Sequence, residues 1–186
     1  MRRARVSRFP APEPACGRFR FNMTELRRQL EWIAGLNNED EASRNIGLYE
    51  RFVLKHGYEF SEVIELPTHV RRGENQMCFG NAALEAIAFP DEFIYTEGYA
   101  YIEGIPLTIL HGWLTDRQGR VVDPTWGTDK KVDYYGVLVK HKYVRSRMGL
   151  SVIDDWRHGW PLLMSKDPTK HLVKLEKWIS SSGPGA

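Results

Sequence analysis

Apolar residues at helical spacing predict two helices near the start of the chain. In the segment LRRQLEWIAGL they recur every three or four residues, which is the spacing of one helix face. Asn22 or Thr24 is expected to cap this first helix, and Gly35 to end it. A second helix is expected over residues 40–56, with Gly57 as its stop.

A third helix is expected over residues 77–89, where the sequence reads MCFGNAALEAIAF. Its many small residues predict close packing against a neighbouring element, and Pro90 stops it. The polar run over residues 68–76 predicts an exposed loop immediately before it. Cys78 therefore falls in the first turn of this helix.

The rest of the chain is typical of antiparallel strands. Segment 92–102 is rich in Phe, Ile and Tyr, and side chains alternate in character over 107–115 and 134–140, on either side of a DRQG turn at 116–119. The segments before and after the turn, 107–115 and 120–123, are expected to pair as a hairpin. A short strand or irregular segment is expected over 59–66, and a last helix over 167–179. Helices followed by antiparallel strands indicate an α+β fold.

The length of 186 residues predicts one domain, over residues 21–179. A net charge of +2 gives no general electrostatic surface for nucleic acid. Basic residues concentrate in residues 1–20, where three prolines predict a solvated, flexible arm. Weak contact of this arm is the only interaction with nucleic acid that the sequence predicts. Residues 180–186 are expected to be a flexible tail.

Cysteine usage and hydropathy indicate a cytoplasmic protein that does not contact membranes. Cys16 and Cys78 are too few for a disulfide framework and lack the spacing of zinc ligands. No apolar run approaches the length of a membrane helix, and no apolar stretch follows the basic residues at the start. A bridge between the two cysteines would remove a free thiol, but a reducing compartment argues against it.

Three groups suited to nucleophilic catalysis follow one another along the chain. Cys78 at a helix start lies where free N–H groups and the helix dipole favour a thiolate. His111 and Asp123 lie on the two arms of the predicted hairpin, where pairing about the turn places His111 near Pro124, one residue from Asp123. A thiolate attacks a carbonyl, an imidazole moves the proton, and a carboxylate orients the imidazole.

At these residues the chain resembles the transglutaminase-like superfamily, which has a papain-like core. The matching segments are MCFGNAAL with Cys78, HGWL with His111, and VVDPTW with Asp123. The resemblance covers about a third of the chain, roughly from residue 76 to residue 139. It implies an α+β fold in which the helix that carries Cys78 packs on an antiparallel sheet with extra flanking helices.

The resemblance also implies a cysteine-dependent amide hydrolase or acyltransferase that forms a thioester with a peptide or protein amide and needs no cofactor. The backbone N–H of Cys78 can supply one oxyanion donor. Gln76 is the preferred second donor, with Asn75 and Tyr58 as alternatives. Trp113 and Trp126 are expected to form walls of the core and of the substrate cleft.

Other readings of the same residues stay open. Cys78 alone could be a small buried apolar residue, His111 a packed histidine, and Asp123 a turn former. The three could also bind a metal, but a fourth ligand is not evident. Alternatively, the fold serves as a catalytically silent peptide-binding or protein-binding module, with its cleft beside Trp113 and Trp126.

Overall fold

The computed structural model describes residues 24–36, 47–128, 130–147, 150–153, 162–163 and 165–181. The predicted basic arm and Cys16 lie outside these residues, as does 182–186 of the predicted tail. Among the described helices, none is both long enough and apolar enough to cross a membrane.

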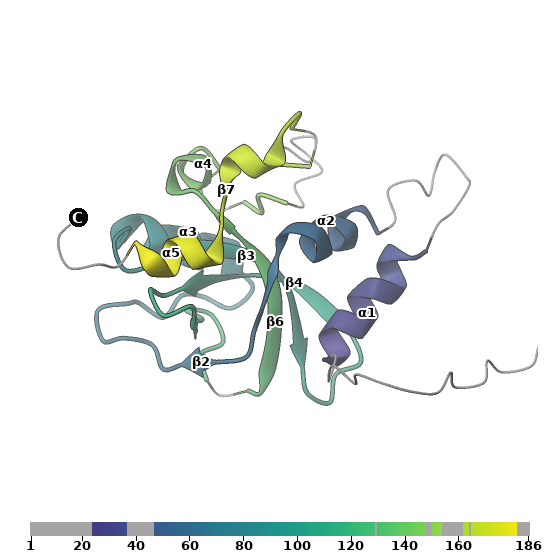
Figure 1. Ribbon diagram of the computed structural model, residues 1–186. Helices are drawn as coiled ribbons and strands as arrows, with labels where there is room; N and C mark the ends of the chain where they lie inside the picture. The colour runs from purple at the N-terminus through teal and green to yellow at the C-terminus, as the bar shows by residue number, and fades with distance from the viewer. Residues whose placement is uncertain are drawn as a thin grey trace, which may run out of the picture.

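A curled, mostly antiparallel sheet forms the centre of the described part of the chain (Figure 1). The strands lie in the order β1-β6-β3-β4-β5-β2, and β7 pairs with β6 beside β1. Only the β2–β5 pair is parallel among the described strands. The strands are β1 (Tyr58–Phe60), β2 (Val63–Ile64), β3 (Ile94–Ile102), β4 (Thr108–Thr115), β5 (Val121–Val122), β6 (Val132–Val139) and β7 (Leu172–Val173).

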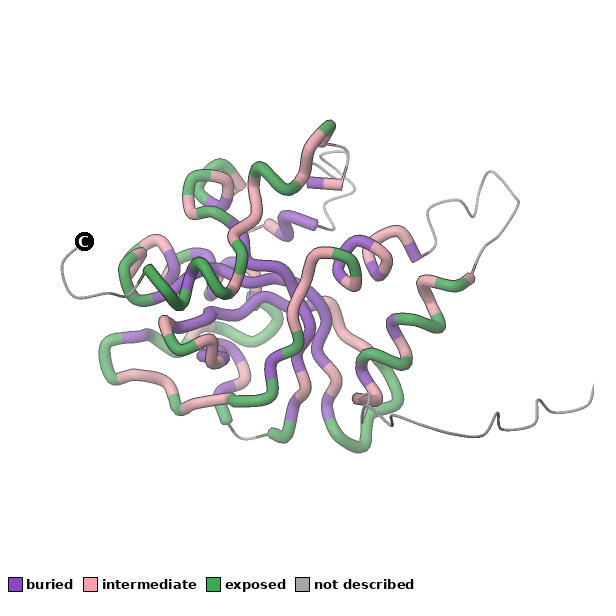
Figure 2. Tube along the Cα trace, in the orientation of Figure 1, coloured by how far each residue is buried: buried purple, intermediate pink, exposed green. Residues whose placement is uncertain are grey.

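Helices cover both faces of this sheet. Buried residues of α1 (Glu25–Ala34), α2 (Leu48–His56), α3 (Cys78–Ala88) and α4 (His141–Arg145) pack with one face in a single apolar cluster. Trp178 of α5 (Leu175–Ser180) packs on the opposite face. Figure 1 shows α1 and α2 together at one end of the sheet, and Figure 2 shows the central strands buried along most of their length. The mixed α+β class is therefore confirmed.

The early helices follow the sequence pattern with one difference. Thr24 caps α1 by accepting a hydrogen bond from the N–H of Arg27, and Gly35 ends it, as expected. The second helix is described only from Leu48. Gly47 precedes it with a φ of 72°, a left-handed conformation that interrupts the predicted helix. The earlier part of that prediction, residues 40–46, lies outside the described residues.

The predicted helix over 167–179 is wrong. A 3-10 turn (Pro168–His171), the strand β7 and the short helix α5 occupy the segment instead. Leu172 and Val173 pair with the edge of β6 at Val139 and Leu138. The edge of β6 offers backbone hydrogen bonds that residues in a continuous helix could not make. The sequence of residues 167–179 alone does not indicate that this strand edge lies beside them.

Two paired glycines on neighbouring strands allow close packing in the core. Gly98 of β3 is paired with Gly136 of β6. A Cβ on Gly136 would lie 2.5 Å from the ring of Trp113, and a Cβ on Gly98 would lie 2.2 Å from the carbonyl of Tyr135. Gly136 therefore makes room for the indole of Trp113, which is fully buried.

A buried carboxylate attaches the segment after α4 to the sheet. Glu97 of β3 is fully buried and accepts hydrogen bonds from Tyr95 Oη at 2.5 Å, Val152 N at 2.8 Å, Ile153 N at 3.0 Å and the hydroxyl of Ser151. Burial raises the pKa of Glu97, and the surrounding donors oppose part of that rise.

We expect Glu97→Gln to lower the free energy of unfolding by about 2–4 kcal/mol, because an amide nitrogen would face donors and leave buried groups unpaired. Urea unfolding measures the change. Glu103→Gln is the matched control, since Glu103 pairs with Lys131 at 3.1 Å on the surface and such pairs contribute about 0–1 kcal/mol. Equal losses in the two variants would contradict the anchoring role of Glu97.

Candidate functional site

The start of α3 presents the thiol of Cys78. Apolar and small residues bury one face of α3, and no side chain caps the helix at Met77. The helix's first backbone hydrogen bond runs from the N–H of Asn81 to the carbonyl of Met77 at 2.8 Å. Within the described residues, no backbone acceptor is found for the N–H groups of Cys78, Phe79 and Gly80. Cys78 is a free cysteine with 9% of its surface exposed.

The sheet leaves an opening for this helix start beside His111. Strand β5 pairs only with Leu114 and Thr115 of β4, so it ends before the level of His111. Gly112 lets α3 approach closely, because a Cβ there would lie 3.2 Å from Cα of Phe79. The truncated strand and the glycine together bring the helix start to the edge of β4.

His111 and Asp123 form a buried hydrogen-bonded pair. Nε2 of His111 lies 2.8 Å from Oδ2 of Asp123, and the two side chains are 1% and 0% exposed. The hairpin register pairs Leu114 with Val122, one residue from the predicted register. Asp123 reaches His111 by its side chain from the turn after β5. Since Nε2 is engaged with Asp123, Nδ1 is the ring nitrogen that can interact with Cys78.

The carboxylate of Asp123 accepts three further hydrogen bonds. The N–H groups of Thr125 and Trp126 donate to Oδ1 at 2.8 and 3.0 Å, and the hydroxyl of Tyr134 donates to Oδ2 at 2.8 Å. Burial opposes ionisation, but the hydrogen bond and charge of His111 and the two backbone donors lower the pKa of Asp123. Asp123 is therefore held as an anion.

Tyr134 was not predicted as a site residue. It lies within the predicted strand, but only the pairing of β6 with β3 and the curl of the sheet bring its hydroxyl to Asp123. Burial first, and then the charge and hydrogen bond of Asp123, raise the pKa of Tyr134, so it acts as a donor.

The surroundings of His111 favour its protonated form. Burial lowers the pKa of His111, but the hydrogen bond with Asp123, the charge of Asp123 and the nearby side chain of Cys78 raise it to about 9. Below that pH, an imidazolium lies between the carboxylate and the sulfur.

Two tryptophans flank the imidazole in different ways. The ring of Trp126 stacks on His111 at a centroid distance of 3.8 Å, and Trp126 is partly exposed. Trp113 lies at 6.4 Å and is fully buried. The expectation that Trp113 lines a substrate cleft is therefore wrong; the indole packs in the core over Gly136, whereas Trp126 borders the surface.

The candidates for the second oxyanion donor differ in position. Gln76 and Asn75 are exposed in the loop before Cys78, and Gln76 is the one described non-glycine residue with a positive φ, at 68°. Tyr58 lies opposite Gly136, which lies opposite Gly98, which in turn lies opposite His111. Tyr58 and His111 are therefore three strand spacings apart, or about 14 Å. The Tyr58 hydroxyl lies 3.4 Å from Glu176, so Tyr58 is excluded as a donor at Cys78.

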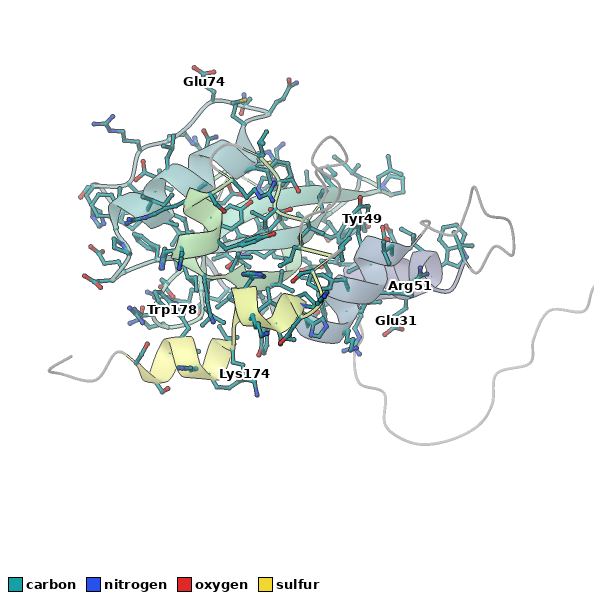
Figure 3. All side chains as sticks on the ribbon, turned by 90° about the horizontal axis from the view of Figure 1, so that it is seen from above. Glu31, Tyr49, Arg51, Glu74, Lys174 and Trp178 are labelled. Atoms are coloured by element: carbon teal, nitrogen blue, oxygen red, sulfur yellow. The ribbon has the colours of Figure 1, made fainter. Side chains whose placement is uncertain are left out.

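Two surface hollows border the loop that precedes Cys78. One, of about 870 Å³, runs along the outer side of α3, where Met77 and Leu84 are 50% and 54% exposed. The other, of about 570 Å³, includes Trp126 and Lys130. Both are lined by Arg72, Gly73 and Glu74; Figure 3 shows Glu74 at the rim of the molecule, on the side away from Trp178 of α5.

Among the described residues, no group of three or more His, Cys, Asp and Glu side chains is arranged to hold a metal ion. Comparisons with protein-family models, with curated proteins and with solved structures found no match to this chain.

Proposed function

We propose that this chain is a cysteine-dependent amide hydrolase or acyltransferase in which Cys78, His111 and Asp123 form a catalytic triad. The observation that carries the proposal is the buried His111, which is hydrogen-bonded to Asp123 through Nε2 while its interaction with Cys78 raises its pKa. In this arrangement the sulfur is the nucleophile, the ring moves protons and the carboxylate orients the ring.

In the first half of the reaction, the thiolate of Cys78 attacks the amide carbonyl carbon and forms a C–S bond. The carbonyl oxygen takes the negative charge, and the N–H of Cys78 donates to it; Gln76 remains the proposed second donor. The imidazolium of His111 gives its Nδ1 proton to the leaving nitrogen. The C–N bond breaks, an amine leaves and a thioester remains.

In the second half, neutral His111 accepts a proton from water or from an amine through Nδ1. The activated oxygen or nitrogen attacks the thioester carbon and the C–S bond breaks. The acyl group leaves as an acid or as a new amide, and the thiolate–imidazolium pair is restored. Asp123 keeps its charge throughout because four donors surround it.

The arrangement of elements supports a papain-like, transglutaminase-like core as part of this proposal. A cysteine at a helix start, a histidine on the next hairpin and an aspartate after the turn follow in that order along α3, β4 and β5. The helix packs on an antiparallel part of the sheet, and α1, α2 and α4 flank it.

A polypeptide amide is the proposed substrate. The hollow beside α3 begins at Met77, the neighbour of Cys78, and its volume of about 870 Å³ is in the range of binding clefts in proteins. Its half-exposed Met77 and Leu84 offer apolar contacts, and Arg71 and Glu74 offer polar ones. These features suit the mixed side chains of a peptide.

Alkylation by iodoacetamide tests the state of the thiol. We expect the rate at Cys78 to change only a few-fold between pH 6 and pH 8.5, because the imidazolium of His111 persists to about pH 9 and stabilises the thiolate. An ordinary cysteine should react about 100-fold faster at the higher pH. Peptide mapping by mass spectrometry separates the two cysteines, and Cys16 is the internal control.

The control sample is the same protein unfolded in urea, in which both cysteines should follow the ordinary profile. If folded Cys78 also follows that profile, the proposed thiolate–imidazolium pair does not exist.

A peptide-binding or protein-binding module is the second candidate, favoured by the enclosure of the triad: Cys78 is only 9% exposed and His111 only 1%. In that case the hollows beside Arg72 would bind the partner without chemistry. An ordinary alkylation profile, together with unchanged partner binding by Cys78→Ala, would support the module over the enzyme.

A further inference from the structure

Asn81 connects two segments that hold opposite sides of the proposed triad. It lies one helical turn after Cys78, and its Nδ2 donates to the carbonyl of Glu74 at 2.8 Å and to Oγ1 of Thr125 at 3.0 Å. Glu74 belongs to the loop before α3, whereas Thr125 belongs to the turn after β5. The amide group of Asn81 therefore joins the loop that precedes Cys78 to the turn that carries Asp123.

Two more hydrogen bonds join the same segments. The N–H of Gly73 donates to the carbonyl of Pro124 at 2.8 Å, and Nη2 of Arg72 donates to the carbonyl of Trp126 at 2.8 Å. Gly73 packs so tightly that a Cβ would lie 2.0 Å from Cγ of Asn81. The amide of Asn81 is thus in close contact with the backbone of Gly73 as well as hydrogen-bonded.

The turn on the far side of this connection determines the geometry of the acid and the ring. The N–H groups of Thr125 and Trp126 donate to Asp123, and the indole of Trp126 stacks on His111. A shift of Thr125 relative to α3 would therefore move Asp123 and His111 relative to Cys78.

We propose that Asn81 is a positioning residue that sets the distance between the thiol of Cys78 and the His111–Asp123 pair by joining the loop at Glu74 to the turn at Thr125. This inference rests on the proposed function. In this role Asn81 acts through the two segments that it connects and not on the reacting atoms, although it also lines the hollow beside α3.

The decisive measurement is the pH profile of Cys78 alkylation in Asn81→Leu and Thr125→Val. Both changes keep the approximate size of the side chain, add no charge and remove one or both hydrogen bonds. We expect the few-fold ratio between the rates at pH 8.5 and pH 6 to rise at least tenfold in Asn81→Leu, and by a smaller factor in Thr125→Val. In the double variant the effects should be less than additive, because one shared contact is lost.

Gln118→Leu and Thr128→Val are the matched controls; both side chains are exposed in turns, and both variants should keep the wild-type profile. Circular dichroism establishes that each variant is folded. If Asn81→Leu does not fold, Thr125→Val still tests the proposal, because it removes only the bond to Thr125 and keeps the bond from Asn81 to Glu74. A merely structural role for Asn81 would change the melting temperature and leave the pH profile unchanged.

The outcomes separate the two proposals. If wild-type Cys78 has an ordinary profile, the proposed function itself fails. If the wild-type profile is flat and the folded variants at Asn81 and Thr125 keep it, the triad stands and the positioning role of Asn81 is overturned.

Discussion

Cys78→Ala is expected to abolish acylation of the protein by p-nitrophenyl acetate, an activated acyl donor. The substitution removes a single sulfur atom at the start of α3, and this sulfur is the proposed nucleophile. Loss of a triad nucleophile lowers rates by about 10³-fold or more. Intact-protein mass spectrometry detects the acetyl adduct, and p-nitrophenol release gives the rate.

Cys16→Ala is the matched control and should keep both the adduct and the rate. An acetyl adduct that persists in Cys78→Ala at the wild-type rate would overturn the proposed mechanism. Thermal unfolding should show that Cys78→Ala stays folded, because the small side chain leaves only a small cavity.

Asp123→Asn is expected to lower the acylation rate by about 10²–10⁴-fold. An amide at this position would keep an oxygen toward the N–H groups of Thr125 and Trp126 and turn its NH₂ toward His111. His111 must then accept through Nε2 and carry its proton on Nδ1, where it cannot take a proton from the thiol or from water. The wrong tautomer removes the base while the fold remains.

The same variant has a distinct signature in stability against pH. Because the folded pKa of His111 is raised to about 9, the interaction stabilises the wild type fully below the unfolded value of about 6.5, and this stabilisation is lost as the pH rises through about 9. We expect the difference in free energy of unfolding between the wild type and Asp123→Asn to shrink across that window. Urea unfolding at pH 6, 7.5 and 9.5 measures it.

Asp91→Asn, the same chemical change at an exposed position before β3, should show neither the rate loss nor the pH dependence. A difference between wild type and Asp123→Asn that is constant from pH 6 to pH 9.5 would mean that Asp123 does not raise the pKa of His111.

Much of the candidate site could be predicted because its parts have strong local signals. The switch from a polar loop to small apolar residues places Cys78 at a helix start, and Pro90 limits the helix. The DRQG turn fixes a hairpin, so His111 and Asp123 come to neighbouring strands within one residue of the predicted register. The difference of one residue does not separate the pair, because β5 ends at Val122 and the side chain of Asp123 reaches His111 from the turn that follows.

Residues that act through distant pairing could not be predicted. Tyr134 reaches Asp123 only through the order of strands β6, β3 and β4, and the same order removes Tyr58 from the site. Trp113 was expected to form a wall of the core or of the cleft, and the structure places it in the core. The indole packs over Gly136 of β6, which comes close to Trp113 only when the sheet forms.

The sequence by itself determined the elements with strong periodicity, the hairpin turn and the order of the three chemical groups. Local sterics and the burial of apolar residues, which act over a few neighbouring positions, specify these features. The tertiary structure alone decided that residues 167–179 divide into a turn, β7 and α5, that Tyr134 donates to Asp123, and that Asn81 joins two loops. Each depends on a hydrogen-bonding partner supplied by a segment distant in the chain, and such partners exist only after the sheet has closed.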